Sequence, residues 1–300
     1  MVKQREEPVG SLRVKKLHPL IGAEVKGIDL SYSLDEKTFG TLYALWMEFQ
    51  ILVFPKQSIT DKQHISFGKQ FGDLEIHPSR MHRSSYDREI YRVSNVDEAG
   101  RIIPPADTAW QYINLSWLWH TDSSFRKVPS KGSILHGIET TNEGGNTLFS
   151  NMYAAYDGLS ESMKNRIQGL YVVHDHDFII KQSKELAIKQ DKGSYERLPL
   201  VSHPLVQIHP ETRRKSLFLS PHTMDHIKEM SAGESRTLLD ELTAHATQAK
   251  YVYRHKWKND DVIMWDNRCT MHSVEPFDNA NIRRIMHRVT LVGEGPPIPA

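Results

Sequence analysis

Two histidines and an aspartate have the side-chain types and spacing of a metal site. His120 and Asp122 lie two residues apart in the segment 117–125. On an extended strand such residues point to the same side, so the imidazole and the carboxylate can bind one cation together. His272 offers a third ligand, and two histidines with one carboxylate leave coordination positions open, as in non-haem Fe(II) oxygenases. A His-x-Asp pair alone is weak evidence, because a hydrogen-bonded histidine at a strand end gives the same pattern.

Histidine is abundant in this chain, so candidate ligands must be separated by their context. The 300 residues include 16 histidines, and the segment 174–177 reads His-Asp-His-Asp, a second cluster that residue types alone do not reject. One cysteine excludes an internal disulfide and a Cys-rich zinc site. With 38 basic and 37 acidic residues the net charge is +1, which argues against nucleic acid as a partner.

The elements that must position these residues favour a mainly β fold with flanking helices. Helices are expected after the capping boxes at 33–36 and 60–63 and over Glu234–Ala246. Strands are expected over Leu12–His18, Ala23–Ile28, Ile51–Phe54, Ile90–Val96, Ser133–Ile138, Tyr171–His174, Pro204–Ile208, Ser216–Leu219, Tyr251–Trp257, Val262–Trp265 and Arg284–Val292. Few helices and many strands, without regular alternation of the two, predict helices packed outside a β-sandwich or jelly roll.

The chain is expected to form a single domain over residues 1–300, with loose termini at about 1–10 and 293–300. No apolar run is long enough to cross a membrane, and the N-terminus lacks the apolar segment of a signal peptide, so we expect a cytoplasmic protein. The segments 97–116 and 179–199 lack clear periodicity, and loops of that length are commonly lids.

Four motifs occur in an order and spacing that resemble a known family. They are Trp119–Phe125, Gly144–Thr147, Trp265–His272 and Arg283–Arg288. Together they resemble the taurine dioxygenase/2,4-dichlorophenoxyacetate dioxygenase family of Fe(II)- and 2-oxoglutarate-dependent dioxygenases. The likeness covers nearly the whole chain. It implies a double-stranded β-helix, or jelly roll, in agreement with the strand-rich pattern.

The resemblance implies that His120, Asp122 and His272 are the catalytic metal ligands. They would bind Fe(II), which with 2-oxoglutarate as cosubstrate and O2 hydroxylates a substrate and releases succinate and CO2. Related halogenases have a small residue in place of the carboxylate, so the intact Asp122 favours hydroxylation.

The resemblance also implies which residues bind the cosubstrate. Arginine suits the distal carboxylate of 2-oxoglutarate because its planar fork donates two charge-assisted hydrogen bonds. The family's cosubstrate arginine corresponds to Arg284, with Thr147 as its hydroxyl partner. Arg283 stays a minor alternative, because Arg284 lies one residue farther from the last metal ligand than in the best-known members. Arg288 would approach the cosubstrate and a substrate anion, and Trp265 would pack near the iron.

The substrate implied by the resemblance is a small anionic organic molecule: an aryloxyalkanoate, a sulfonate or a related carboxylic acid. His77 resembles a sulfonate-binding histidine, whereas Arg80 stands where the taurine enzyme has a tyrosine. Ser116, Phe178 and Arg288 are further candidate substrate contacts. For His77 and Arg80 a solvated pair of loop residues is the alternative.

Three other functions remain open at this point. The first is an oxygenase of the same chemistry, a hydroxylase or desaturase, in natural-product biosynthesis. A zinc hydrolase with the same ligands and a non-catalytic jelly-roll binding protein belong to other classes, and the Thr147–Arg284 pair argues against both. The expected partner is a small organic acid, with no nucleic acid and no membrane, and a homo-oligomer is compatible with the sequence.

Overall fold

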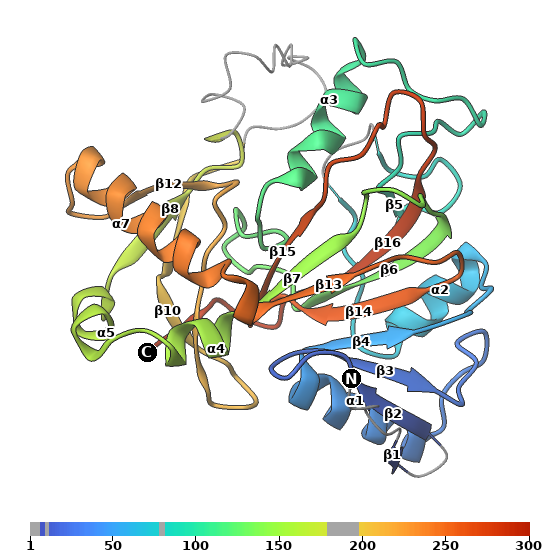
Figure 1. The fold of residues 1–300 in the computed structure, drawn as a ribbon, viewed down its shortest axis with the longest axis horizontal. Helices are drawn as coiled ribbons and strands as arrows, with labels where there is room; N and C mark the ends of the chain where they lie inside the picture. Colours follow the sequence, from blue (N-terminus) through green and yellow to red (C-terminus); the bar gives the residue numbers. More distant parts are fainter. Residues whose placement is uncertain (1–6, 10–11, 78–81, 179–197) are drawn as a thin grey trace.

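The computed structural model describes residues 7–9, 12–77, 82–178 and 198–300 (Figure 1). Its helices are α1 (Glu36–Phe49), α2 (Asp61–Lys69), α3 (Thr108–Asn114), α4 (Met152–Asp157), α5 (Glu161–Ile167) and α7 (Ala232–Ala246), with the 3-10 turns η1 (Leu115–Trp117) and η2 (Ala249–Tyr251). Its strands are β1 (Glu7–Val9), β2 (Leu12–Lys16), β3 (Ala23–Lys26), β4 (Ile51–Phe54), β5 (Tyr91–Arg92), β6 (Gly132–Glu139), β7 (Thr147–Asn151), β8 (Tyr171–His174), β9 (Val201–Pro204), β10 (Val206–Ile208), β11 (Lys215–Leu217), β12 (Met224–Ile227), β13 (Val252–His255), β14 (Val262–Asp266), β15 (Thr270–Val274), β16 (Ile285–Leu291) and β17 (Ile298–Pro299).

Two sheets pack face to face and form the jelly roll expected from the sequence. The larger has eight strands in the order β1-β2-β3-β4-β14-β6-β16-β5, and the smaller has the order β13-β7-β15. Phe149 of β7 and Trp265 of β14 belong to one apolar cluster, with their ring centroids 5.4 Å apart. This cluster lies between the sheets, so the side chains that point inward from both sheets meet there.

The central strands are apolar throughout because both of their faces are covered. All residues of β4 and β14 are buried, since α1 packs on one face and the smaller sheet lies over the other. Helix α1 buries Trp46 against this sheet. Its N-cap is Asp35, whose side chain accepts from the backbone N–H of Thr38. The capping box predicted at Ser33 is therefore wrong by two residues, whereas the box at 60–63 is present and opens α2.

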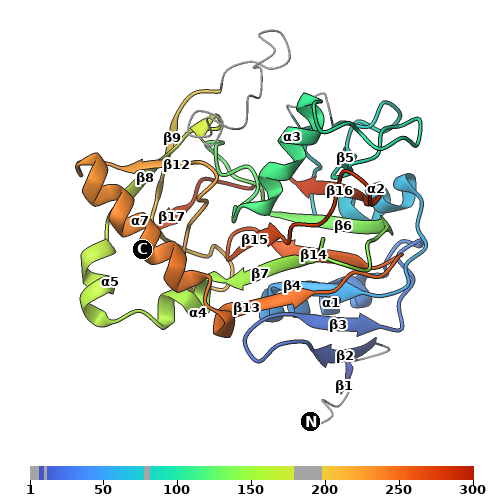
Figure 2. The same cartoon turned by 45° about the horizontal axis from the view of Figure 1, so that its top comes forward.

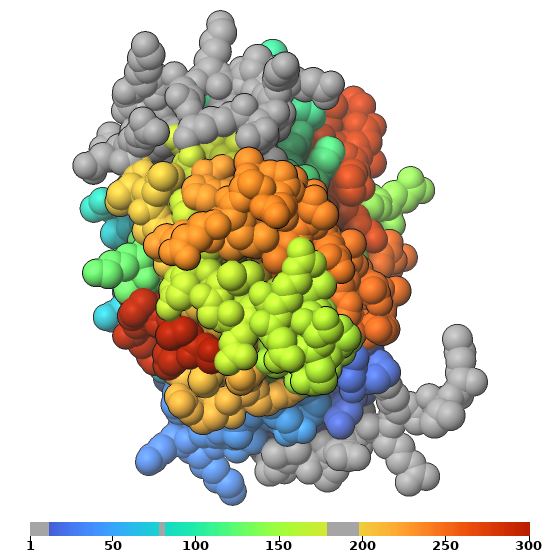
Figure 3. Space-filling view, turned by 90° about the vertical axis from the view of Figure 1, so that its left-hand side faces the viewer, coloured from blue at the N-terminus to red at the C-terminus, as the bar shows by residue number. Residues whose placement is uncertain are grey.

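Three further helices cover the opposite end of the molecule. Helices α4, α5 and α7 share an apolar cluster with β8, β10, β11, β12 and β15. Figure 3 shows α4 and α5 in yellow-green and α7 in orange, side by side on this face. This cluster supports the back of β15, the strand that carries His272.

The structure corrects several expectations about irregular segments. The stretch 97–116 contains α3, which lies above the open end of the two sheets in Figures 1 and 2. Short helices at 152–157 and 161–167 had no clear pattern in the sequence, and the strand expected at 90–96 is only two residues long. The C-terminal tail is not loose, because β17 pairs with β10. Most of 179–199 lies outside the described residues. None of the described helices is long and apolar enough to cross a membrane.

Candidate active site

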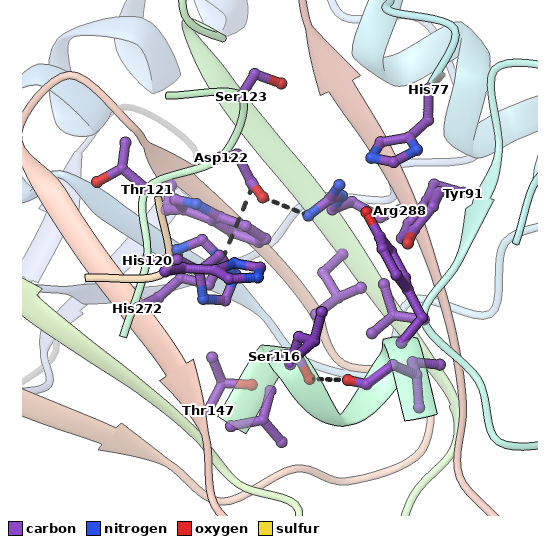
Figure 4. Close-up of a pocket in the computed structure, with 18 of the residues that line it drawn as sticks. His77, Tyr91, Ser116, His120, Thr121, Asp122, Ser123, Thr147, His272 and Arg288 are labelled. Atoms are coloured by element: carbon purple, nitrogen blue, oxygen red, sulfur yellow. Dashed lines mark hydrogen bonds and ion pairs between the residues drawn. The ribbon is translucent and has the colours of Figure 1, made fainter. Parts of the chain in front are cut away.

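His120 and His272 face each other across an antiparallel backbone bridge. The N–H of His120 donates to the carbonyl of His272 at 2.8 Å, and the reverse bond is 2.9 Å long. The two imidazole centroids lie 4.2 Å apart (Figure 4). Strand β15 is held by β7 on its other side, with Phe149 opposite His272 in the register. The strand pairing thus brings together two histidines that are far apart in the sequence.

Asp122 completes the group, and both of its carboxylate oxygens have partners. Oδ2 accepts from the Ser133 hydroxyl at 2.7 Å, and Oδ1 accepts from Nη1 of Arg288 at 2.5 Å. Burial opposes ionisation of this carboxyl, but the positive charge of Arg288 and the neighbouring histidines outweigh it, and the pKa of Asp122 lies well below its usual range. The side chain is therefore a carboxylate at neutral pH.

The three side chains offer donor atoms that all lie within 4.8 Å of one another. The Nδ1–H of His120 donates to the carbonyl of Leu118 at 2.7 Å, which leaves the Nε2 lone pair available. Nε2 of His272 lies 3.9 Å from Oδ2 of Asp122. Burial lowers the pKa of both histidines, so both rings are neutral near pH 7 and can act as ligands. This donor set fits Fe(II), which accepts two imidazoles and a carboxylate with open positions.

A second group of metal-type residues lies at the end of β14. His209, Asp266 and Cys269 are buried, and one donor atom of each lies within 4.8 Å of the others. Nδ1 of His209 accepts from two backbone N–H groups, and its Nε2–H donates to Asp266 at 3.0 Å. Arg268 donates to both oxygens of that carboxylate. Both ring nitrogens and the carboxylate are already engaged, so this group is an internal polar network.

Arg284 supplies a buried guanidinium next to the triad. It is 4% exposed, and within the described ranges neither Nε nor Nη2 has a hydrogen-bond partner. Its own backbone N–H donates to the Asn95 side chain at 2.7 Å. Burial lowers the pKa of Arg284 to about 10, so the group stays charged at neutral pH. A buried cation with two unmet donors fits an anionic ligand such as a carboxylate.

Thr147 lines the same cavity as Arg284. Its hydroxyl oxygen accepts from the indole N–H of Trp257 at 2.9 Å. Because an indole N–H is only a donor, the hydroxyl proton of Thr147 can be given to another acceptor. The sequence singled out Thr147 but not Trp257.

The two neighbouring arginines just before β16 have different surroundings. Arg283 lies on the outer side, where Nε and Nη2 donate to Glu139 and Nη1 donates to the carbonyl of Gly100. Arg284 points into the cavity. The geometry thus distinguishes Arg284 from the alternative that the sequence left open.

Arg288 lies between the triad and a group of aromatic side chains. Besides its bond to Asp122, its guanidinium carbon lies 4.9 Å from the ring centroid of Tyr91. The ring of His77 lies 4.2 Å from Tyr91 and also lines the cavity (Figure 4). Burial and the charge of Arg288 hold the pKa of His77 well below its usual value. His77 is thus a neutral wall residue rather than a solvated one.

The other predicted substrate contacts have different outcomes. Ser116 lines the cavity, and its hydroxyl donates to the carbonyl of Ile113. Phe178 is absent from the cavity lining in the described part of the chain, and its ring packs 5.8 Å from the guanidinium carbon of Arg236. Arg80 lies outside the described residues.

Sequence reasoning did not single out several wall residues, because which side chains line a cavity depends on the tertiary arrangement and not on the local pattern. These are Tyr91, Tyr112, Ile113, Leu115, Phe125 and His222. Tyr112, Ile113 and Leu115 come from α3 and η1, and a helix expected in 97–116 would have signalled them. His222 lies beside the His-Asp-His group, with its ring centroid 5.7 Å from that of His120.

Trp265 was expected near the metal, and its ring lies 4.9 Å from that of His272. The indole N–H donates to Oδ1 of Asn267 at 2.9 Å. The ring therefore forms part of the wall behind the triad, while its polar edge is turned toward Asn267.

Comparisons with known proteins agree with this geometry. Residues 13–290 match the model of the family described as "Taurine catabolism dioxygenase TauD, TfdA family". A 2,4-dichlorophenoxyacetate dioxygenase dependent on alpha-ketoglutarate from Burkholderia sp. (strain RASC) is 36% identical over 94% of this chain and 95% of that protein. An (S)-phenoxypropionate/alpha-ketoglutarate dioxygenase from Sphingobium herbicidovorans is 34% identical over 94% of this chain and 95% of that protein.

A solved structure supports the same relationship. The crystal structure of AAD-2 in complex with Mn(II) and N-oxalylglycine has a TM-score of 0.85 and 33% identity, over 96% of this chain and 99% of that one. The named relatives are dioxygenases, not zinc hydrolases or binding proteins. This chain therefore belongs to the TauD/TfdA family and is a 2-oxoglutarate-dependent non-haem iron dioxygenase.

Proposed function

We propose that this chain, as one domain over residues 1–300, hydroxylates a small anionic organic substrate. The substrate would be an aryloxyalkanoate, a sulfonate or a related carboxylic acid. The observation that carries the proposal is the buried Arg284 guanidinium with two unmet donors, in the same cavity as an open His-Asp-His group. A hydrolase or a simple binding protein has no need of such a clamp beside a metal site.

His120, Asp122 and His272 would hold the metal. Their rings are neutral and their carboxylate is ionised near pH 7, so no proton has to leave before binding. Bound there, Fe(II) with 2-oxoglutarate and O2 would supply the oxidising power that converts a substrate C–H bond into C–OH, with succinate and CO2 as co-products.

Arg284 and Thr147 would hold the distal carboxylate of 2-oxoglutarate. The guanidinium offers Nε–H and Nη2–H, and the Thr147 hydroxyl can donate because its oxygen already accepts from Trp257. Both side chains are buried, and the low dielectric of a buried site strengthens charge-assisted hydrogen bonds.

The substrate would lie between Arg288 and the aromatic wall. Nε of Arg288 has no partner in the described ranges, so this cation can attract a carboxylate or sulfonate while Nη1 stays on Asp122. His77, Tyr91, Tyr112 and Phe125 line the remaining wall. This aromatic surface supports an aryl-bearing acid over a short polar one such as taurine.

Two measurements test the proposal. Anaerobic addition of Fe(II) and 2-oxoglutarate should give a weak metal-to-ligand charge-transfer band in the visible. A panel of aryloxyalkanoates, sulfonates and carboxylates should then be assayed for succinate formation, with mass spectrometry of the products. Hydroxylated product from an aryloxy acid supports the proposal, and a desaturated product would favour the biosynthetic alternative. Absence of the band, or no substrate-coupled succinate with any acid, contradicts it.

A further inference from the structure

A buried chain of hydrogen bonds runs behind Asp122, on the side away from the cavity. The indole N–H of Trp265 donates to Oδ1 of Asn267 at 2.9 Å. The amide nitrogen of Asn267 lies 3.4 Å from the hydroxyl of Ser133, which donates to Oδ2 of Asp122 at 2.7 Å. Ser133 and Asn267 are at most 2% exposed, so water does not compete for these bonds.

The indole of Trp265 fixes the direction of every hydrogen bond in this buried row of bonds. An indole N–H can only donate, so Asn267 must turn its amide oxygen toward Trp265. The amide NH2 then faces Ser133, whose oxygen accepts and whose proton is left for Asp122. Bonds aligned in one direction polarise one another, which strengthens the last bond to the carboxylate.

The pairing of β6 with β14 brings the residues of this hydrogen-bond chain together. Ser133 on β6 is the register partner of Trp265 on β14, and Asn267 follows at the end of β14. Neither Ser133 nor Asn267 is among the described residues that line the cavity of the triad. Their polar groups are buried in the sheet. The Ser133 side chain reaches that site through Asp122, and the Asn267 side chain reaches it through Ser133 and through Trp265, which lines the cavity.

Ser133 and Arg288 together orient the Asp122 carboxylate. One bond reaches each oxygen, and two fixed bonds define the plane of the carboxylate. Arg288 faces the cavity and carries the charge that would attract a substrate anion. Ser133 is uncharged and enclosed, so it can keep Asp122 in place when Arg288 engages a ligand.

We propose that Ser133 and Asn267 are positioning residues that orient Asp122 for the metal through a hydrogen-bond chain whose direction is set by Trp265. The proposal rests on the proposed function, because it takes Asp122 as a metal ligand. The loss of groups that orient a metal ligand usually costs 10–100-fold in metal affinity. Substitution of Ser133 or Asn267 should therefore lower the metal affinity although the three ligands themselves are unchanged.

The test is a titration of the apo-protein with Mn(II), in which electron paramagnetic resonance reports the free ion. Ser133→Ala should raise the Kd for Mn(II) by about tenfold. Ser150→Ala is the matched control: Ser150 is a buried strand serine whose hydroxyl donates to the carbonyl of Ala246, and its Kd should stay within twofold of wild type. Thermal unfolding of the apo-proteins measures how much each serine contributes to the fold.

Trp265→Phe keeps an aromatic ring but removes the donor that sets the direction together with the pyrrole half of the buried indole, so thermal unfolding of this apo-variant is measured as well. Because the 3.4 Å link between Asn267 and Ser133 is the weakest, we expect a smaller increase in Kd, about threefold. This variant tests the proposal even if Ser133→Ala does not fold.

A spectroscopic signature separates this role from a general loss of structure. A carboxylate that loses a hydrogen bond donates more charge to the metal. In Ser133→Ala the charge-transfer band of the Fe(II)–2-oxoglutarate complex should therefore move to longer wavelength. An unchanged Mn(II) Kd and band in Ser133→Ala would overturn the positioning role. Failure of the wild-type protein to bind Mn(II) at this site would instead contradict the proposed function.

Discussion

Two groups of histidine and acidic or thiol side chains could hold a metal in the described part of the chain, and their donor atoms have different neighbours. In the group of His120, Asp122 and His272, ring nitrogens remain open toward a cavity. In the group around His209 and Asp266, both histidine nitrogens are engaged, and the carboxylate is neutralised by an arginine. Residue types and distances alone do not separate the two groups. The deciding property is whether lone pairs remain available after the local hydrogen bonds are counted.

The difference between the two groups predicts the largest effect at His120, Asp122 and His272, whose ring nitrogens remain open. His120→Ala removes one of the three proposed metal ligands, so Mn(II) affinity should fall by more than the roughly 100-fold that loss of an orienting group can cost. Fe(II) and 2-oxoglutarate should then give no charge-transfer band. Retention of the band would mean that another donor takes the place of His120 and that the open lone pair does not define the site.

Substitution in the group of His209, Asp266 and Cys269 should instead lower the stability of the fold and leave metal binding unchanged. His209→Ala removes one of the two donors to Oδ2 of Asp266, takes the acceptor from the backbone N–H groups of Glu211 and Thr212, and opens a small cavity. The free energy of unfolding should therefore fall by about 2–3 kcal/mol. Denaturant unfolding of the apo-protein measures this. The Mn(II) Kd of the folded variant should stay within twofold, and His209→Gln, which keeps a donor for Asp266, should lose less stability. A large drop in metal affinity would show that this group also binds metal.

Arg283 and Arg284 differ in the same way, but in their hydrogen-bond donors: those of Arg283 are engaged, whereas two donors of Arg284 have no partner in the described ranges. Arg284→Gln removes the guanidinium whose donors are unmet, so the KM for 2-oxoglutarate should rise about 30-fold, as expected for about 2 kcal/mol of charge-assisted bonding. Arg283→Gln breaks only its bonds to Glu139 and Gly100, and the KM should change less than twofold. Steady-state kinetics with 2-oxoglutarate varied measures both. The reverse pattern would reassign the cosubstrate site to Arg283.

The sequence was sufficient for the jelly roll, because strongly apolar strands such as β4 and β14 have a clear local pattern. The family motifs named His120, Asp122 and His272, and the structure brings their donor atoms within 4.8 Å of one another. It missed α3, α4 and α5, which are short and owe their stability to packing on the sheets. Ser133 and Trp257 were missed because nothing local marks them. Their roles depend on a partner more than 10 residues away along the chain, Asp122 or Thr147, which only the strand register brings near.

A third histidine environment tests whether one open nitrogen is enough to make a metal site. His64 of α2 is buried, donates from Nε2 to the carbonyl of Ile134, and has no partner for Nδ1 in the described ranges. It belongs to neither ligand group, so its open nitrogen should act as a proton acceptor only.

Burial lowers the pKa of His64 from 6.5 to about 3, and the nearby His136 lowers it further. The neutral ring therefore contributes stability that is fully present above pH 6.5 and is lost as the pH falls from 6.5 toward 3, since the unfolded chain binds the proton first. In His64→Phe the slope of the unfolding free energy against pH should decrease by about 1.4 kcal/mol per pH unit between pH 6 and 4, the value for one proton. Denaturant unfolding at several pH values, with and without Mn(II), measures the slope. Equal slopes in wild type and variant would contradict a neutral buried His64, and a difference that Mn(II) abolishes would mean that a single open nitrogen recruits metal after all.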